Sequence, residues 1–554
     1  MRWQNIRSTD GRATALATLV FAVLAFSLAA PEAPAACGVR SYCCMVPMQD
    51  GTYLATDVYR PRFPRGRYPA VLVRTADGRG QFSTREARLV CRQGYALVIQ
   101  DVRGCFGSRD SDAIVFRSDK SDGQDTIRWI TRQCWSDGNV GTWGPSAMGV
   151  AQNLLAPDAP GNLRAQYVMM AFSNMYAQAA YEGGVLRQSL VEGWLRPEKY
   201  GHNDLQAVLD HPKYDQFWAE VNPEPHADRV NTPGVFCGGW YDAFLQGTIN
   251  SFANINTRGG PRARGNCRLI VGPWSHKDIK RLINPANARS LPRAANPFRF
   301  FDHWLKCRPS CVPCDKPVHY YVMGDRCDPC SPGNRWRAAD TWPPPAAATN
   351  FYFHADGKMQ LNAPPAGDDK LSYKYDPANP VPTLGGRNLI LRPGPLDQRS
   401  VESRGDVLLF TTGVLKRPIE VTGHVLATLY VSSDCPDTDF TVKLTDVYPD
   451  GRSVLLADGI RRARFRESFE REDFLEPGKV YPLTVDLWST SIVLSKGHRI
   501  RIAVSSSNAP RFQPNPNTGL PPGDDAKPRI AANTLHLSEE HPSHITLPLC
   551  EPKQ

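Results

Sequence analysis

The sequence has 554 residues, of which 41% are hydrophobic and 22% charged, and its formal net charge is +10. This length exceeds that of a typical single domain, so we expect two or three domains, enough for an enzyme core with accessory modules. The positive charge is mild for such a chain. Because no block of lysine and arginine and no interleaving of basic with aromatic residues occurs, the sequence argues against a nucleic-acid-binding protein.

The chain begins with the features of a secretory signal peptide. Three arginines precede an apolar stretch over residues 13–30, and small residues with prolines follow through Ala36. The apolar stretch is short for a membrane span, and the small residues suit cleavage between Ala30 and Cys37. We therefore expect removal of residues 1–36 and a secreted or periplasmic mature protein. No later run is long enough to span a bilayer.

Between residues 37 and 172, short apolar runs alternate with helical patterns. The runs at 70–73, 96–100 and 167–171 suit buried strands, whereas 123–133 suits a helix. This alternation is typical of a parallel sheet whose strands are connected by helices.

Ser146 lies where a predicted strand turns sharply into a predicted helix. Residues 140–144 form a short apolar run ending in glycine, and a helix-compatible run starts at Ala147. Such a turn presents a serine hydroxyl at the carboxyl end of a strand, and the small residue before the serine allows the strained backbone. Met148 replaces the second glycine of the strict Gly-x-Ser-x-Gly pattern, so the motif alone is weak evidence.

Residues 173–231 are helical in pattern and rich in aromatic side chains. Core packing explains most of these rings, and the others could line a substrate pocket. Strand signals then return: the run 234–241 ends directly before Asp242, and the run 267–275 ends directly before His276.

Ser146, Asp242 and His276 stand in the chain order nucleophile, acid, base. A serine hydroxyl is a weak nucleophile until an imidazole accepts its proton, and the imidazole needs a carboxylate that fixes its tautomer. Taken singly, a serine in a glycine-rich turn, an aspartate after a strand or a lone histidine is more often structural. The ordered set of three strand-end residues favours a serine hydrolase with an α/β-hydrolase sheet.

All fifteen cysteines follow the predicted leader, which leaves an odd number in the mature chain. The densest group contains two Cys-x-x-Cys pairs: Cys307, Cys311, Cys314, Cys327 and Cys330. Export favours disulfides, although this spacing would suit zinc in a cytosolic protein, so zinc is the alternative. Cys105 and Cys134 are a further candidate pair.

The C-terminal part predicts a β-sandwich. Residues 343–348 resemble a linker, and short β-rich runs broken by glycine, proline and aspartate follow at 351–353, 389–391, 425–431, 440–444, 492–494 and 500–504. This spacing of short strands suits a sandwich. Neither a phosphate-binding loop nor a nucleotide fingerprint occurs, so we expect no cofactor.

The chain resembles the cocaine-esterase-like (CocE/NonD) hydrolases, relatives of the Xaa-Pro dipeptidyl-peptidases and the α-amino acid ester hydrolases. Besides the three segments above, the matching segments are residues 50–52, 100–104, 122–130, 300–305, 419–423, 437–440 and 497–501. The resemblance implies an α/β fold: an α/β-hydrolase domain over 37–172 and 232–346, a helical cap inserted at 173–231, and a jelly-roll β-sandwich over 347–554.

The resemblance also implies Ser146 as nucleophile, Asp242 as orienting acid and His276 as general base. One departure concerns the oxyanion: relatives have a tyrosine hydroxyl in an Arg-x-Pro-Tyr segment, whereas Asp77 stands at that position here. An ionised carboxylate there would repel a developing oxyanion, and loss of one donor typically costs about 3 kcal/mol. The backbone N–H of Ala147 is the predicted oxyanion donor, and the second donor is unassigned.

We expect a serine hydrolase that cleaves a small-molecule carboxylic ester, or an amide, through an acyl-enzyme and without metal. One alternative is an Xaa-Pro dipeptidyl-peptidase. Residues 243–246 offer no carboxylate cluster for a substrate ammonium, which disfavours it. A second alternative, motivated by Asp77, is a secreted binding protein on the same fold with weak catalysis.

Overall fold

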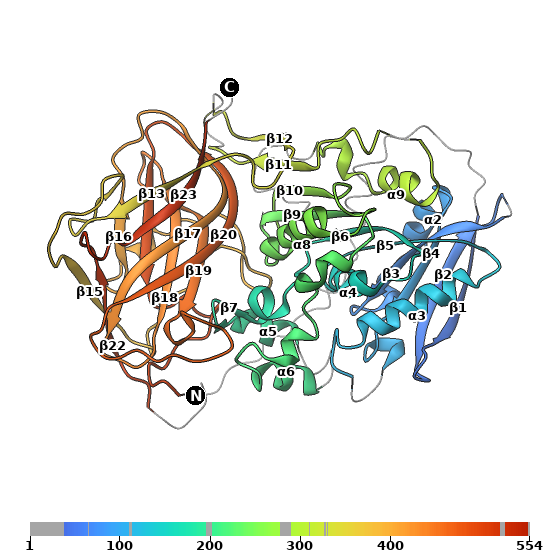
Figure 1. Cartoon of the computed structure of the whole chain (residues 1–554), viewed down its shortest axis with the longest axis horizontal. Helices are drawn as coiled ribbons and strands as arrows, with labels where there is room; N and C mark the ends of the chain where they lie inside the picture. Colours follow the sequence, from blue (N-terminus) through green and yellow to red (C-terminus); the bar gives the residue numbers. More distant parts are fainter. Residues whose placement is uncertain are drawn as a thin grey trace.

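The computed structural model describes residues 38–64, 66–109, 113–195, 202–276, 290–309, 311–325, 328, 331–520 and 527–551. A helix-covered sheet and a β-sandwich lie side by side, with a group of short helices between them (Figure 1). The predicted leader falls outside the described residues, as do Cys327 and Cys330. No helix in the described part of the chain is long and apolar enough to cross a membrane.

The first unit is built on a ten-stranded sheet with the order β1-β2-β4-β3-β5-β6-β9-β10-β11-β12. Its strands are β1 (Val39–Pro47), β2 (Tyr53–Pro61), β3 (Tyr68–Thr75), β4 (Ala96–Asp101), β5 (Ser136–Pro145), β6 (Leu163–Met169), β9 (Gly234–Tyr241), β10 (Arg268–Ser275), β11 (Val318–Val322) and β12 (Arg335–Ala339). The strands from β4 through β11 in this order are parallel, and β1, β2 and β12 are antiparallel to their neighbours. The predicted parallel sheet is therefore confirmed.

Helices cover both faces of this sheet, because its strands are apolar on both sides. The helices are α2 (Thr84–Arg92), α3 (Asp119–Thr131), α4 (Ala147–Leu155), α8 (Leu245–Arg258) and α9 (Pro297–Leu305). Helices α2 and α9 share one apolar cluster with Val71 and Ile99, whereas α3 and α4 share another with Leu72 and Val98. Alternate residues of one strand thus face opposite helix layers, as the pleat of a strand requires.

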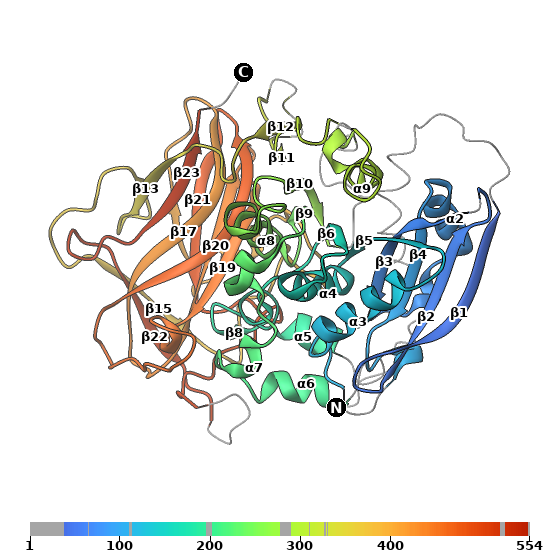
Figure 2. The ribbon, with the colours of Figure 1, turned by 45° about the vertical axis from the view of Figure 1, so that its right-hand side comes forward.

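The stretch between β6 and β9 contains the short helices α5 (Gln188–Trp194), α6 (His202–Leu209) and α7 (Gln216–Ala219), the π-helix η4 (Tyr176–Ala180), and a hairpin of β7 (Tyr181–Glu182) and β8 (Val185–Leu186). Figure 2 shows this group packed between the carboxyl ends of the sheet strands and the sandwich. It occupies the position expected for a cap.

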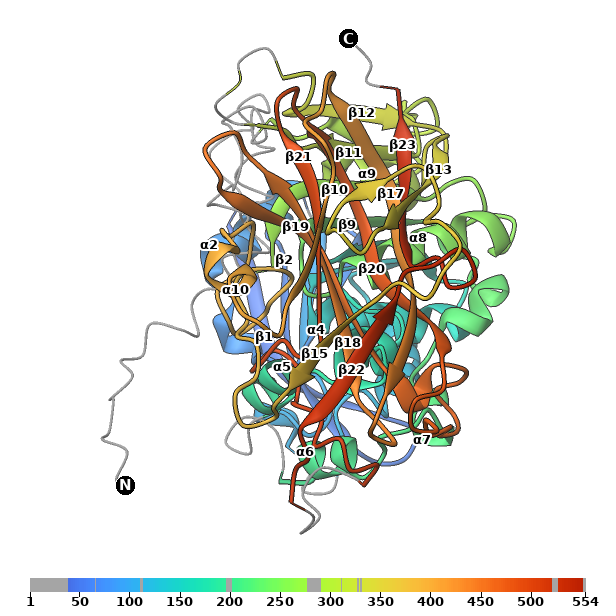
Figure 3. The ribbon, with the colours of Figure 1, turned by 90° about the vertical axis from the view of Figure 1, so that its left-hand side faces the viewer.

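The second unit is a sandwich of a seven-stranded and a four-stranded sheet (Figure 3). The first contains β13 (Ala347–Phe353), β14 (Met359–Gln360), β15 (Lys370–Tyr375), β17 (Ile419–Ser433), β20 (Tyr481–Leu494), β22 (Ala531–His536) and β23 (His544–Cys550); the second contains β16 (Leu408–Thr411), β18 (Asp439–Val447), β19 (Ser453–Arg462) and β21 (Arg499–Ser505). A short helix, α10 (Arg399–Glu402), precedes β16.

Two sequence predictions are wrong. Residues 389–391 form a bend instead of a strand, because they lie in a loop whose ends are joined by backbone hydrogen bonds between Gly386 and Gly394, at 2.9 and 3.0 Å. The predicted disulfide between Cys105 and Cys134 is absent: Cys105 is buried in the core, whereas Cys134 is an exposed free thiol.

The sandwich is joined to the first sheet by backbone hydrogen bonds as well as by apolar contacts. Met323, just after β11, donates its N–H to the carbonyl of Ser491 at 3.0 Å and accepts from the N–H of Val493 at 2.9 Å. The Tyr241 hydroxyl donates to the carbonyl of Leu455 at 3.1 Å. These contacts fix the sandwich against the carboxyl ends of β9 and β11.

Candidate active site

Ser146 stands at the tip of a strained turn between β5 and α4. Its φ and ψ angles are 55° and −129°, a conformation that a non-glycine residue adopts only when its surroundings enforce it. Gly144 has a φ of 154°, and a Cβ atom on it would lie 2.4 Å from the Cβ of Met148. The predicted strand–turn–helix is thus confirmed, and glycine at position 144 is what lets α4 return so closely against the strand.

Asp242 and His276 follow the ends of β9 and β10 and meet Ser146 at the same edge of the sheet. Nε2 of His276 lies 3.0 Å from Oγ of Ser146, and its Nδ1 lies 2.7 Å from Oδ2 of Asp242. Ser146 is 5% exposed and the other two residues are fully buried. The three residues singled out in the sequence are therefore brought together in the nucleophile–base–acid arrangement.

The carboxylate of Asp242 is held from two sides. Its Oδ1 accepts the backbone N–H of Phe244 at 2.7 Å, while Oδ2 faces His276. The Phe244 ring also packs edge-on against the His276 ring, with centroids 5.2 Å apart. Because the site is buried, these polar contacts act at a lower effective dielectric than in water. No local pattern in the sequence indicates this backbone contact.

The backbone around the nucleophile suits the stabilisation of an oxyanion. Ala147 is the first residue of α4, so its N–H has no acceptor within the helix. The positive end of the helix dipole also lies there, which favours a developing negative charge. This position at the start of α4 suits the role of oxyanion donor, which stays a prediction for Ala147.

Asp77 follows β3, the strand next to β5. These strands pair in parallel with Leu72 opposite Thr142, so Asp77 and Ser146 follow neighbouring strand ends. The Asp77 side chain is 4% exposed, and its backbone N–H donates to Oγ1 of Thr75 at 3.0 Å. This N–H is therefore already engaged, and the second oxyanion donor is still unassigned.

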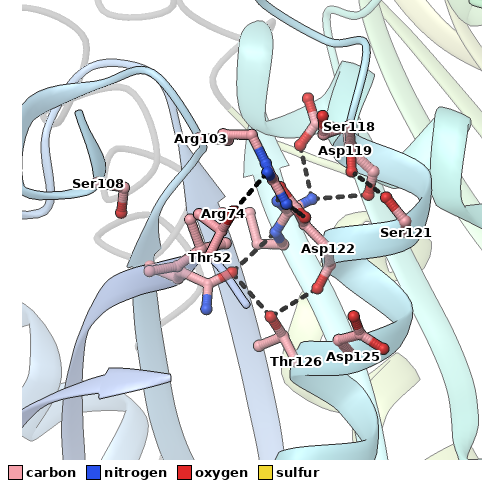
Figure 4. A network of polar contacts seen from close by, with 12 residues as sticks. Thr52, Arg74, Arg103, Ser108, Ser118, Asp119, Ser121, Asp122, Asp125 and Thr126 are labelled. Carbon is pink, nitrogen blue, oxygen red and sulfur yellow. Dashed lines mark hydrogen bonds and ion pairs between the residues drawn. The ribbon is translucent and has the colours of Figure 1, made fainter. Parts of the chain in front are cut away.

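A network of ion pairs anchors the carboxyl ends of β3 and β4 to the first turn of α3 (Figure 4). Nη1 of Arg74 lies 2.6 Å from Oδ1 of Asp119, and Nη2 of Arg103 lies 2.7 Å from Oδ1 of Asp122. Burial raises the pKa of Asp119, and the charge of Arg74 opposes that rise. Because Arg74 is only three residues from Asp77, this network, which no local sequence pattern indicates, fixes the strand end beside Ser146.

An apolar pocket opens beside Ser146. Its described lining contains no charged side chain. The rings of Phe116, Phe172, Trp194 and Phe244 form much of the wall. Leu389, from the sandwich unit, closes one side.

The described cysteines and acidic residues form no metal centre: no group of three or more His, Cys, Asp or Glu in the described ranges is arranged to hold a metal ion. Cys307, Cys311 and Cys314 are exposed free thiols. The other two cysteines of the group, Cys327 and Cys330, lie outside the described residues, so disulfides within this group stay a prediction.

Two family models match this chain. The X-Pro dipeptidyl-peptidase (S15 family) matches residues 50–200 and 196–278, and the X-Pro dipeptidyl-peptidase C-terminal non-catalytic domain matches residues 314–546. The first match spans Ser146, Asp242 and His276. The second spans most of the sandwich.

Individual relatives match over nearly their full length. The cocaine esterase of Rhodococcus sp. (strain MB1 Bresler) is 35% identical, with 91% of this chain and 97% of the relative covered. A putative serine esterase of Mycobacterium tuberculosis is 26% identical, covering 93% and 96%. Among solved structures, an α-amino acid ester hydrolase superposes with a TM-score of 0.79 at 24% identity, covering 99% of this chain and 100% of that one, which shows a shared fold.

Proposed function

Because this chain belongs to the cocaine-esterase-like (CocE/NonD) family of serine hydrolases, we propose that it hydrolyses carboxylic esters through an acyl-enzyme formed on Ser146. The observation that carries the proposal is the hydrogen-bonded series from Ser146 through His276 to Asp242. Two of its members are fully buried and the third nearly so, which keeps water from competing for these contacts. The Rhodococcus and Mycobacterium relatives named as esterases support the same reaction.

In this mechanism, Oγ of Ser146 attacks the ester carbonyl while Nε2 of His276 takes the hydroxyl proton. Asp242 stabilises the imidazolium that forms, and the Ala147 N–H donates to the oxyanion of the tetrahedral intermediate. Collapse of the intermediate breaks the C–O bond, and His276 returns the proton to the leaving alcohol. A water molecule, deprotonated by Nε2 of His276, then attacks the acyl-enzyme carbonyl. Collapse of this second intermediate breaks the bond between the acyl carbon and Oγ of Ser146, Oγ regains its proton from His276, and the carboxylic acid is released.

The pocket beside Ser146 favours an acyl group that is apolar. Aromatic and aliphatic side chains surround it, and its described lining offers no partner for a charged group. Since burial of a charge without a partner is costly, an acyl group bearing a free ammonium would be excluded. The S15 match alone would suggest the Xaa-Pro dipeptidyl-peptidase reaction. The absence of an ammonium partner in the described lining favours ester hydrolysis over it.

A substrate panel separates these two reactions. We expect the purified protein to hydrolyse p-nitrophenyl benzoate with a kcat/KM at least about a hundredfold above that for Gly-Pro p-nitroanilide, because the pocket lacks an ammonium partner. p-Nitrophenyl acetate serves as a control for the reactivity of the leaving group, and initial rates at 405 nm give the comparison. Faster turnover of the Gly-Pro amide would reverse the assignment.

The charge of Asp77 is expected to restrain the rate. Asp77→Asn keeps the size of the side chain, removes a negative charge beside the proposed oxyanion site and adds an N–H donor, so we expect kcat/KM for esters to rise by about tenfold. Asp137→Asn, an exposed substitution near the start of β5, is the matched control for net charge. If Asp77→Asn leaves the rate at the control level, the Asp77 side chain does not act on the oxyanion.

Export is the second part of the proposal. It rests on the arginines, the apolar stretch and the small residues of the first 36 positions. Expression of the full chain in a bacterial host, followed by N-terminal sequencing of the periplasmic and culture fractions, tests it. Intact leader on cytoplasmic protein would argue against export.

A further inference from the structure

Five charged side chains are buried together where the cap hairpin meets the sandwich: Glu182, Arg187, Arg387, Asp458 and Arg511. None is more than 2% exposed. Arg511 joins the two acids, with its Nη1 2.7 Å from Oδ2 of Asp458 and its Nη2 3.2 Å from Oε2 of Glu182. Nε of Arg187 lies 3.3 Å from the same Glu182 oxygen. Acids and bases thus alternate, as buried charges require.

Arg187 differs from the other two arginines because its guanidinium also holds three separate backbone segments. Its Nη1 donates to the carbonyls of Gln178, in η4, and of Ala243, at 3.0 Å. Its Nη2 donates to the carbonyl of Arg387, at 3.2 Å, in the sandwich segment that leads to Leu389. One planar group therefore connects the cap, the loop after β9 and the sandwich, and its rigid fork fixes their relative positions.

The bond to Ala243 leads directly to the triad. The carbonyl of Ala243 and the N–H of Phe244 belong to the same peptide group, which is planar and rigid. Arg187 holds the oxygen of this group, and its N–H donates to Oδ1 of Asp242 at 2.7 Å. A guanidinium on the carbonyl polarises the peptide and strengthens the bond made by its N–H.

We propose that Arg187 is a positioning residue for the triad, which acts on Asp242 through the Ala243–Phe244 peptide. The inference rests on the proposed function, and it adds that the cap and the sandwich control the acid of the triad through one side chain. Burial lowers the pKa of Arg187 to about 10, so the guanidinium stays charged at neutral pH. Without it, the Ala243–Phe244 peptide would be free to tilt, and the Asp242 carboxylate would lose one of its two fixed contacts.

The test compares Arg187→Lys with Arg511→Lys. Both substitutions keep a positive charge in the same buried cluster and lose a guanidinium fork, but only Arg187 contacts the Ala243 carbonyl. We expect Arg187→Lys to lower kcat for p-nitrophenyl benzoate by about tenfold to a hundredfold and to change KM by less than about twofold. Arg511→Lys should keep kcat within about twofold of the parent protein, even if it lowers the melting temperature as much as Arg187→Lys does.

A spectroscopic signal separates positioning from general destabilisation. The proton between Nδ1 of His276 and Asp242 gives a far-downfield ¹H resonance when that hydrogen bond is short. This resonance can be measured without any substrate. We expect Arg187→Lys to shift or broaden this resonance and Arg511→Lys to preserve it. Equal losses of kcat in the two variants, or an unchanged resonance in Arg187→Lys, would overturn the proposal. Failure of the parent protein to hydrolyse any ester would instead count against the proposed function.

Two further variants test the proposal if Arg187→Lys does not fold. Glu182→Gln alone retains Arg187, whereas Glu182→Gln with Arg187→Met removes one charge of each sign from the cluster. We expect the double variant to have a kcat at least about tenfold below that of Glu182→Gln. Equal kcat values for these two proteins would overturn the assignment of Arg187.

Discussion

Ser146→Ala is expected to lower kcat for ester hydrolysis by about 10⁴-fold to 10⁶-fold, the range found when the nucleophile of a serine hydrolase is removed. Alanine cannot form the acyl-enzyme, and the remaining groups can only bind the ester and orient water. The loss should fall on kcat, because the apolar pocket beside position 146 is left intact. Steady-state kinetics with p-nitrophenyl benzoate measure the effect.

Fluorophosphonate labelling gives an independent measurement of the same change. The parent protein should carry the label on the peptide that contains Ser146, and Ser146→Ala should carry none. Ser251→Ala, which removes the hydroxyl of a buried serine in α8, is the matched control and should label at the parent rate. A folded Ser146→Ala protein that still hydrolyses esters at a tenth of the parent rate would remove Ser146 from the mechanism.

The triad could be predicted from the sequence because each of its members follows a buried strand. The carboxyl ends of parallel strands share one edge of a sheet, so the order of Ser146, Asp242 and His276 along the chain already constrained their positions in space. Helix α3 and strands β3, β4 and β6 were predicted for a related reason, since their apolar periodicity is local.

The groups that shape the site around the triad could not be predicted in this way. Arg187 and Arg387 are 200 residues apart in the chain, and Arg511 and Glu182 are 329 apart, so no local pattern connects them. Leu389 was assigned to a strand because it lies in an apolar run, whereas it lies in a loop closed by hydrogen bonds between Gly386 and Gly394, and it lines the pocket. Contacts that depend on how two units dock produce no periodic pattern of apolar residues in either segment of the sequence.

Asp242→Asn is expected to lower kcat by about 10⁴-fold with little change in fold, and the reason lies in the contact with Phe244. The Phe244 N–H is 2.7 Å from Oδ1, so the amide oxygen of the introduced asparagine would occupy that position. Its NH₂ group would then face Nδ1 of His276, at the place where Oδ2 lies 2.7 Å away in the parent protein. An N–H donor there requires an unprotonated Nδ1, which puts the proton on Nε2.

The tautomer selected by that amide cannot accept the Ser146 proton, because Nε2, 3.0 Å from Oγ, would itself carry a hydrogen. The variant should therefore bind substrate normally and also lose fluorophosphonate labelling, since both reactions need the same deprotonation. ¹⁵N NMR of the imidazole, with a histidine-labelled protein, would report the proton on Nε2 directly. If Asp242→Asn kept more than about a tenth of the parent kcat, Asp242 would not be the group that orients His276. The proposed role of Arg187, which acts through Asp242, would then be contradicted as well.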